Sequence, residues 1–256
     1  MNTVINFDAD MVRKYDRHGP RYTSYPTAVQ FNNEVNNDIY IEELEKSNQG
    51  NKSLSLYFHI PFCNSLCFYC ACAKIITKKP ERSIPYLERV YKELHHQAAL
   101  ISPNRVVEQL HFGGGTPTFL SDEQFIEMFE HIRKNFTLAP VENREFSIEI
   151  DPRAVRESTI EVLRNLGFNR ISLGVQDFDP KVQKAVNRIQ SVAQTFAVID
   201  TARAVGYKSV SVDLIYGLPC QTVDSFKATL DLVMQKRPDR LSIYSYAHMP
   251  QKVRSQ

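Results

Sequence analysis

The chain has 256 residues, of which 43% are apolar and 23% are charged. This composition is typical of a globular protein and excludes a disordered, collagen-like or coiled-coil chain. The formal net charge of +2 gives no bulk attraction for nucleic acid. Without a run of about 18 apolar residues the sequence predicts no transmembrane helix, and its charged start lacks the apolar segment of a signal peptide. We therefore expect a cytoplasmic protein with neither a nucleic-acid nor a membrane partner.

Residues 1–53 form a polar N-terminal arm, rich in Asn and Asp. The prolines and small hydroxylated residues of segment 19–27 predict extended or turn structure, and 38–46 is expected to be a short helix. Basic and aromatic side chains are interleaved in the arm at Arg13, Lys14, Tyr15, Arg17, Arg21, Tyr22 and Tyr25. The arm is either solvated or a lid over a substrate with several carboxylates, which arginine pairs in a bidentate manner.

From residue 54 onward, strand-like and helix-like patterns alternate. Runs of β-branched and aromatic residues predict strands at 54–60, 107–112, 146–150, 170–175, 209–216 and 240–246. Helical periodicity predicts helices at 86–100, 122–136, 155–166, 192–205 and 225–236. This alternation predicts an α/β fold with a parallel sheet. Six β/α units are two fewer than in a complete barrel, so we expect residues 54–256 to form a partial (β/α)6 barrel that carries the N-terminal extension.

The cysteines predict a metal centre after the first strand. Four of the five cysteines lie within ten residues, at Cys63, Cys67, Cys70 and Cys72, and the fifth is Cys220. The C-x3-C-x2-C spacing of the first three lets thiolates wrap an iron–sulfur cluster and would leave one iron open to a ligand. A closed zinc or cluster site with Cys72 as fourth ligand, or inert thiols, remain the alternatives.

Other polar or glycine-rich segments follow later strands. The turn 113–117 (GGGTP) would let backbone approach a ligand closely, but a plain tight turn gives the same pattern, and it matches neither a dinucleotide motif nor a P-loop. Glu149, Gln176 and Asp213 lie towards strand C-termini, the end where β/α barrels carry their active sites. Taken alone, Asp151 is an ordinary turn residue and Arg188 a solvated helix-end charge. His59 is either a core histidine or faces the cysteine loop.

Together these segments resemble the radical S-adenosylmethionine (SAM) enzymes, and among them the oxygen-independent coproporphyrinogen III oxidases. The resemblance is carried by GPRYTSYPT (19–27), YFHIP (57–61), the cysteine motif (63–72), HFGGGTP (111–117), SIEIDP (147–152), GVQDF (174–178), VNR (186–188), DLIYGLP (213–219) and YAHMP (246–250). It covers nearly the whole chain. Ala71 stands where this family usually has glycine.

The resemblance implies cofactors and positions for them. Cys63, Cys67 and Cys70 would hold a [4Fe–4S] cluster whose open iron binds SAM, with Cys72 as an extra, non-ligand cysteine. Tyr57, Gly114 and Glu149 match positions that contact the cluster-bound SAM. A second SAM molecule is implied by Tyr69, Gly115, Thr116, Gln176, Arg188, Asp213 and Ala247. The resemblance implies no catalytic side chain, because the cofactors carry the radical chemistry.

The implied reaction is the oxidative decarboxylation of two propionates of coproporphyrinogen III to vinyl groups, giving protoporphyrinogen IX in haem biosynthesis. A one-electron reductant such as flavodoxin or ferredoxin is the expected partner, and the complete protein is expected to be a monomer. A haem-trafficking chaperone of the same family is the alternative. Members of the family continue into a helical C-terminal region, so we expect this chain to lack it, to expose Leu241 and Ile243, and to be poorly active alone.

Overall fold

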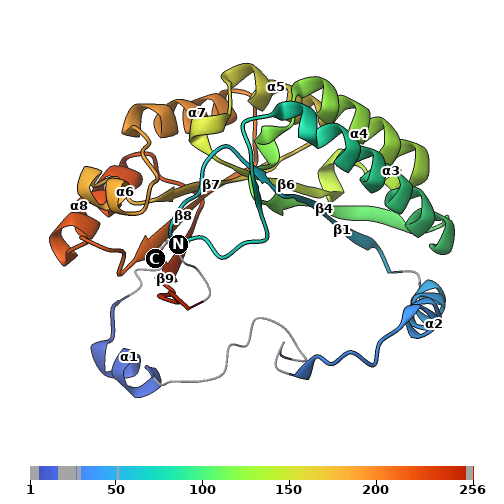
Figure 1. The fold of residues 1–256 in the computed structure, drawn as a ribbon, viewed down its shortest axis with the longest axis horizontal. Helices are drawn as coiled ribbons and strands as arrows, with labels where there is room; N and C mark the ends of the chain where they lie inside the picture. Colours follow the sequence, from blue (N-terminus) through green and yellow to red (C-terminus); the bar gives the residue numbers. More distant parts are fainter. Residues whose placement is uncertain (1–5, 17–26, 28–29, 51, 252–255) are drawn as a thin grey trace. The chain divides into compact units, whose positions relative to one another are not determined.

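The computed structural model describes residues 6–16, 27, 30–50, 52–251 and 256 (Figure 1). The chain divides into two units, Met1–Glu43 and Leu44–Gln256. The first contains helix α1 (Ala9–Tyr15), which Asp8 caps, and helix α2 (Asn37–Asn48) runs across the boundary.

The basic and aromatic arm is described only in part. In α1 the Arg13 guanidinium pairs with Asp10 at 2.8 Å, and the Lys14 ammonium lies 5.3 Å from the centre of the Tyr15 ring. Arg17, Arg21, Tyr22 and Tyr25 lie outside the described residues, and so does the segment predicted to be extended or a turn at 19–27, except for its last residue. The role of the arm as a lid therefore stays a prediction.

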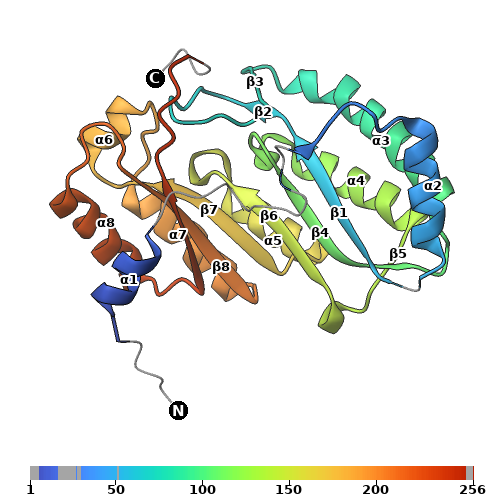
Figure 2. The ribbon, with the colours of Figure 1, turned by 90° about the horizontal axis from the view of Figure 1, so that it is seen from below.

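The second unit is built on a parallel sheet of order β1-β4-β6-β7-β8-β9, with β5 added beside β4 (Figure 2). Its strands are β1 (Leu54–Ile60), β4 (Val106–Gly114), β5 (Thr137–Leu138), β6 (Glu145–Ile150), β7 (Arg170–Gln176), β8 (Ser209–Tyr216) and β9 (Arg240–Ser245). A separate two-stranded ladder pairs β2 (Phe62–Cys63) with β3 (Ile75–Ile76). Because β1 and β9 end the strand order without pairing to each other, the sheet is the predicted partial barrel.

Helices α3, α4, α5 and α7 lie along one face of this sheet (Figure 1). The longer helices are α3 (Ser83–Leu100), α4 (Asp122–Asn135), α5 (Glu157–Leu166), α7 (Val192–Ala204) and α8 (Val223–Gln235), and the short ones are α6 (Pro180–Ala185), η2 (Pro80–Arg82), η3 (Pro117–Phe119), η4 (Val141–Asn143) and η5 (Pro152–Ala154). Capping boxes begin α4 at Ser121 and α7 at Ser191. No helix in the described ranges has the length and apolar character needed to cross a bilayer.

Two of the differences from the sequence prediction have clear local causes. The helix predicted from residue 155 begins at Glu157, because Val155 is extended, with φ −140°, and Arg156 occupies the N-cap. Helix α6 was not predicted, although Asp179 caps it and Pro180 fills its first position. Six residues give too few turns for helical periodicity to be seen.

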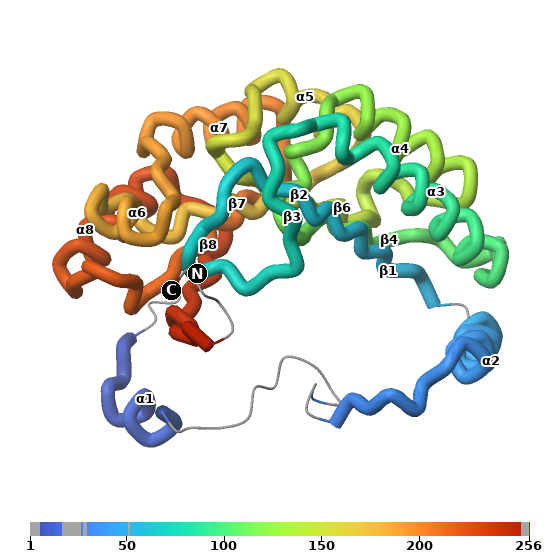
Figure 3. Tube along the Cα trace, viewed as in Figure 1, coloured from blue at the N-terminus to red at the C-terminus, as the bar shows by residue number. Residues whose placement is uncertain are grey.

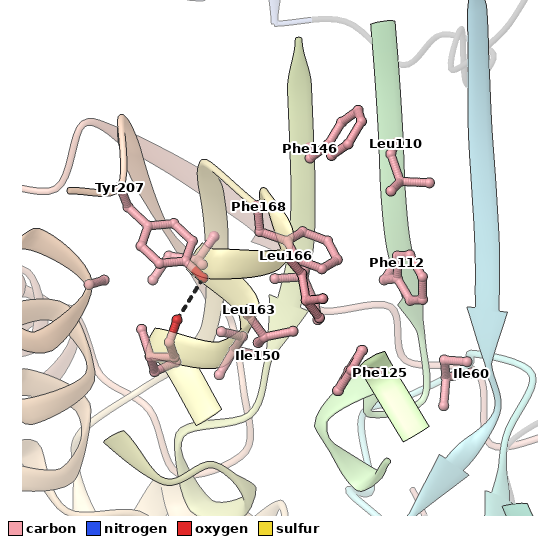
Figure 4. Packing of buried hydrophobic residues seen from close by; sticks show 14 of the residues in the cluster. Ile60, Leu110, Phe112, Phe125, Phe146, Ile150, Leu163, Leu166, Phe168 and Tyr207 are labelled. Atoms are coloured by element: carbon pink, nitrogen blue, oxygen red, sulfur yellow. Dashed lines mark hydrogen bonds between the residues drawn. The ribbon is translucent and has the colours of Figure 1, made fainter. Parts of the chain in front are cut away.

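The hydrophobic core lies between the sheet and these helices (Figure 4). Phe112 of β4 is stacked on Phe129 of α4 and meets Phe168 edge to face, with ring centres 6.2 and 5.4 Å apart. All three rings are fully buried, and each such side chain stabilises the fold by about 1.5–3 kcal/mol. The Tyr207 hydroxyl donates to the Ile160 carbonyl, as the dashed line in Figure 4 shows.

The other face of the sheet is polar. Side chains alternate between the two faces of a strand, and a cavity on this face is lined by the polar side chains of His111, Ser147, Ser172, Ser211 and Ser242 from five adjacent strands, together with Arg240 and the apolar Ile171 and Leu241. Complete β/α barrels fill this position with bulky apolar layers. Here the concave face can instead receive polar ligands.

Strand β9 lies at the end of the sheet. Its residues Leu241 and Ile243 are 38% and 47% exposed, as the sequence predicted.

Candidate active site

The strand C-termini surround a cavity of about 280 Å³. The segments after β1, β4, β6 and β7 contribute to its lining, and β8 contributes Asp213 from within the strand. Eleven of the thirteen predicted site residues line it: Cys63, Cys67, Tyr69, Cys70, Gly114, Gly115, Thr116, Glu149, Gln176, Arg188 and Asp213. The structure thus brings together residues separated by up to 150 positions in the sequence.

The cysteine loop, visible in Figure 3 between β2 and β3, is fixed by backbone contacts on both sides. The Phe68 N–H donates to the Val186 carbonyl at 2.9 Å, and the Asn187 amide donates to the Leu66 carbonyl at 2.7 Å. Lys74 donates to the carbonyls of Cys70 and Cys72 at 2.7 and 3.2 Å. These bonds hold the loop in shape without using any cysteine side chain.

The cysteine sulfurs have different surroundings. Burial raises the pKa of Cys63, although its sulfur accepts a hydrogen bond from the Thr116 hydroxyl at 3.4 Å. A hydrogen bond from the Cys72 thiol lowers the pKa of Cys70 to about 6 and raises that of Cys72. This pair therefore favours Cys70 as the thiolate and Cys72 as its protonated neighbour.

The donor set of this cavity fits an iron–sulfur cluster. Three thiols face one cavity, and hydroxyl and guanidinium donors lie beside two of the sulfurs. Among the described residues no three Cys, His, Asp or Glu side chains converge on one metal ion. Cluster ligation does not require such convergence, since each thiolate binds a different iron.

The glycine turn crosses close to the start of the cysteine loop. The Gly114 N–H donates to Glu149 Oε2 at 3.2 Å, which ties β4 to β6 inside the cavity. A Cβ atom on Gly115 would lie 2.7 Å from the Pro61 carbonyl oxygen. Because that contact is with backbone and cannot yield, the position requires glycine, and the turn has a packing role as well as a place in the site.

Gln176 ends β7, and Asp213 lies within the neighbouring strand β8. Gln176 has φ +68° at a register shift between these strands, a conformation that costs a non-glycine residue free energy and is common at functional sites. The Ser172 hydroxyl donates to both carboxylate oxygens of Asp213 at 2.9 Å. Burial raises the pKa of Asp213. Both side chains line the cavity.

Arg188 and Asp151 form a buried ion pair, so the readings of a solvated helix-end charge and an ordinary turn residue are wrong. Arg188 is 7% exposed, and its Nη2 lies 3.3 Å from Asp151 Oδ1 and 2.5 Å from the Gly174 carbonyl oxygen. Although burial alone would raise the pKa of Asp151, Arg188 and Arg153 hold it below its usual value. Sequence reasoning missed Arg153, which lies two residues after Asp151.

The two remaining predicted residues, Tyr57 and Ala247, lie outside the lining of the cavity. Tyr57 is 58% exposed, and its hydroxyl hydrogen-bonds with His59 Nδ1 at 3.0 Å. The other ring nitrogen of His59 lies 2.9 Å from the Ala73 carbonyl oxygen, so this histidine contacts the backbone of the cysteine loop. Ala247 follows β9, and its carbonyl accepts a bond from Gln256.

The chain matches the family model described as the Radical SAM superfamily over residues 57–233. It is 51% identical over 252 residues to the oxygen-independent coproporphyrinogen III oxidase of Pseudomonas aeruginosa, covering 98% of this chain and 55% of that protein. The Escherichia coli protein of the same name is 44% identical over 96% of this chain and 53% of its own length. The chain thus spans about half the length of the curated relatives it matches.

Solved structures agree with this similarity. Coproporphyrinogen III oxidase (HemN) from Escherichia coli, described as a radical SAM enzyme, superposes with a TM-score of 0.88 at 42% identity, over 98% of this chain and 55% of that chain. The radical SAM methyltransferase TsrM from Kitasatospora setae gives a TM-score of 0.53 at 13% identity, over 78% of this chain and 36% of that one. At that identity the second match supports the fold alone.

Proposed function

Since the chain belongs to the radical SAM superfamily, we propose that it is the cofactor-binding part of an oxygen-independent coproporphyrinogen III oxidase. The substrate would be coproporphyrinogen III, and the reaction the conversion of two propionates to vinyl groups. The observation that carries this proposal is the 51% identity to a relative of that name over 98% of the chain. The cavity at the strand C-termini agrees with it, because it gathers most of the residues that the proposal requires.

The cofactors of the chain are a [4Fe–4S] cluster and SAM. When bound, they supply one-electron chemistry and a radical that removes hydrogen from the substrate. We assign the cluster to Cys63, Cys67 and Cys70. We leave Cys72 outside the proposed ligand set, because its thiol donates a hydrogen bond to Cys70.

SAM would occupy the remainder of the cavity. The Glu149 carboxylate, tied to the Gly114 N–H, can accept hydrogen bonds from an ammonium group, and Asp213 can accept them from ribose hydroxyls. Gln176 and the backbone of the glycine turn add neutral donors and acceptors. A first SAM molecule is assigned to Tyr57, Gly114 and Glu149. A second is assigned to Tyr69, Gly115, Thr116, Gln176, Arg188, Asp213 and Ala247.

The remaining roles belong to the same proposal. Residues 1–53 are assigned as an arm that covers a substrate rich in carboxylates, and residues 54–256 as the cofactor-binding partial barrel. Electrons would come from a one-electron reductant such as flavodoxin or ferredoxin in the cytoplasm. The complete protein is proposed to be monomeric.

The function is tested with the complete protein, its cluster assembled anaerobically, because this chain alone is expected to be poorly active. Reduction with dithionite in the presence of SAM is expected to release 5′-deoxyadenosine and methionine. With coproporphyrinogen III deuterated at the propionate β-carbons, deuterium should appear in the 5′-deoxyadenosine. SAM cleavage without any transfer of deuterium would contradict this substrate, and the absence of both cluster and cleavage would contradict the function altogether.

Glu149→Ala and Gln176→Ala are expected to weaken SAM binding while leaving iron content unchanged, because neither side chain supplies sulfur. Loss of one hydrogen bond to a charged group costs about 1.5–3 kcal/mol, which corresponds to a roughly 10- to 100-fold rise in the dissociation constant of SAM for Glu149→Ala. Calorimetric titration of SAM into cluster-loaded protein measures this. The exposed Glu142 of η4 provides the matched control Glu142→Ala, which should bind as the wild type does. Wild-type affinity in both test variants would remove these residues from the site.

A further inference from the structure

Arg153 lies beside the cluster-binding cysteines without any role assigned to it so far. It belongs to η5, the single turn that follows β6, and its side chain is only 20% exposed. Its Nη2 lies 3.6 Å from Cys67 Sγ, within hydrogen-bond distance for sulfur. The guanidinium is therefore aimed at one of the three sulfurs assigned to the cluster.

A second guanidinium reaches the same sulfur from another part of the chain. Arg188 Nη1 also lies 3.6 Å from Cys67 Sγ. Asp151 holds the two arginines together: it accepts from Arg153 Nη2 at 2.7 Å and Nε at 3.0 Å, and it lies 3.3 Å from Arg188. Both guanidinium groups are thus oriented by protein contacts before a cluster binds, so no reorganisation is needed to direct them at the sulfur.

The other two cysteines lack this environment among the described residues. Cys63 Sγ accepts from the neutral hydroxyl of Thr116, and Cys70 is paired with the Cys72 thiol. Lys74 approaches the backbone carbonyl of Cys70, not its sulfur. The direct cationic contacts of the cysteine loop are therefore concentrated on Cys67.

The positive charge of Arg153 and Arg188 is not fully balanced by the carboxylates around them. Among the described residues, Asp151 is the carboxylate that contacts both guanidinium groups, while Asp213 acts on Arg188 at longer range, so the positive charge next to Cys67 is only partly offset. Asp151 and Arg188 have side chains only 11% and 8% exposed, where screening by water and salt is weak. The remaining positive charge therefore acts on a cluster that is bound through Cys67 Sγ.

We propose that Arg153 is a positioning residue that acts through Cys67 to raise the reduction potential of the cluster, with Asp151 fixing its orientation. This inference rests on the proposed function, since it requires Cys67 to be a cluster ligand. Reduction moves one electron from an external one-electron donor into the cluster and breaks no bond. The added negative charge is stabilised by a nearby cation and by N–H···S hydrogen bonds, both of which raise the potential of iron–sulfur clusters.

The test uses cluster-loaded protein and the midpoint potential of the cluster, measured by dithionite titration with redox mediators and EPR of the reduced state. R153Q removes the charge but keeps a polar tip, and R153M removes it while filling the space with an apolar chain. Both are expected to keep wild-type iron and sulfide content and to shift the midpoint to more negative potential. The matched control is R156Q, three residues along the same segment, whose 76% exposed side chain points to Asp122 at 3.6 Å. Its midpoint should overlay that of the wild type.

Three outcomes would overturn the inference: a midpoint unchanged in R153Q and R153M, a shift to more positive potential, or loss of the cluster from both variants. The last would make Arg153 necessary for cluster assembly instead of for its potential. Failure of the proposed function looks different. In that case wild-type protein itself would assemble no cluster, or Cys67→Ser would retain one, whatever happens in the Arg153 variants.

Discussion

Replacing Cys67 with serine is expected to leave the protein without its iron–sulfur cluster. The Cys67 side chain is 8% exposed and faces the cavity with Cys63 and Cys70, and a serine hydroxyl at this position does not provide the thiolate that iron requires. Iron and sulfide per chain should fall to background after anaerobic reconstitution, and the brown absorbance should disappear. Cys63→Ser and Cys70→Ser are expected to give the same result.

Two other cysteines provide the controls for this experiment. Cys72 and Cys220 are both exposed, and serine at either position should leave the cluster in place. Cys72→Ser replaces the thiol that donates to Cys70 with a hydroxyl donor and removes no proposed ligand. If Cys72→Ser lost its iron while Cys67→Ser kept it, the ligand assignment would be wrong and the alternative of a site closed by Cys72 would be restored.

Asp151→Asn is expected to destabilise the protein by about 3–5 kcal/mol. The substitution leaves Arg153 and Arg188 facing each other with no carboxylate between them, and breaking a buried ion pair by removing one partner has a cost of this order. Urea unfolding of the cluster-free protein, followed by circular dichroism, should show a lower midpoint with an unchanged slope.

The same substitution at the protein surface separates this effect from a general loss of charge. Asp200 pairs with Lys236 at 2.5 Å, but its side chain is 57% exposed, and surface ion pairs contribute only about 0–1 kcal/mol. Asp200→Asn should therefore unfold close to the wild-type midpoint. Equal midpoints for Asp151→Asn and Asp200→Asn would show that the buried pair adds nothing to stability.

Most of the sheet could be predicted from the sequence because its strands have strong patterns with clear ends. The predictions for β1 and β8 match the observed bounds, since each is rich in β-branched or aromatic residues and ends before a Pro or Gly. Ladders of two residues, such as β2 with β3, could not be predicted. They form because the cysteine loop folds back on itself, not because their residues favour strands.

Within the site, some residues could be predicted from local sequence patterns, whereas others take their place only through tertiary contacts. The cysteine spacing and the glycine turn are local patterns, and both lead to the cavity. Arg153 has no local signal, because an arginine after Asp-Pro looks like a solvated charge in any sequence. Its proposed role depends on the end of β6 lying beside the loop that contains Cys67, 86 residues earlier in the chain, and periodicity carries no information about that contact.

The residues that build the fold lie on one face of the sheet, and the residues that can face ligands lie on the other, polar face. Side chains that stabilise the protein point toward the helices, whereas Ser147, Ser172, Ser211 and Ser242 point the other way and bury little apolar area. A protein built in this way can acquire a different substrate preference through mutations on one face without first having to gain stability on the other.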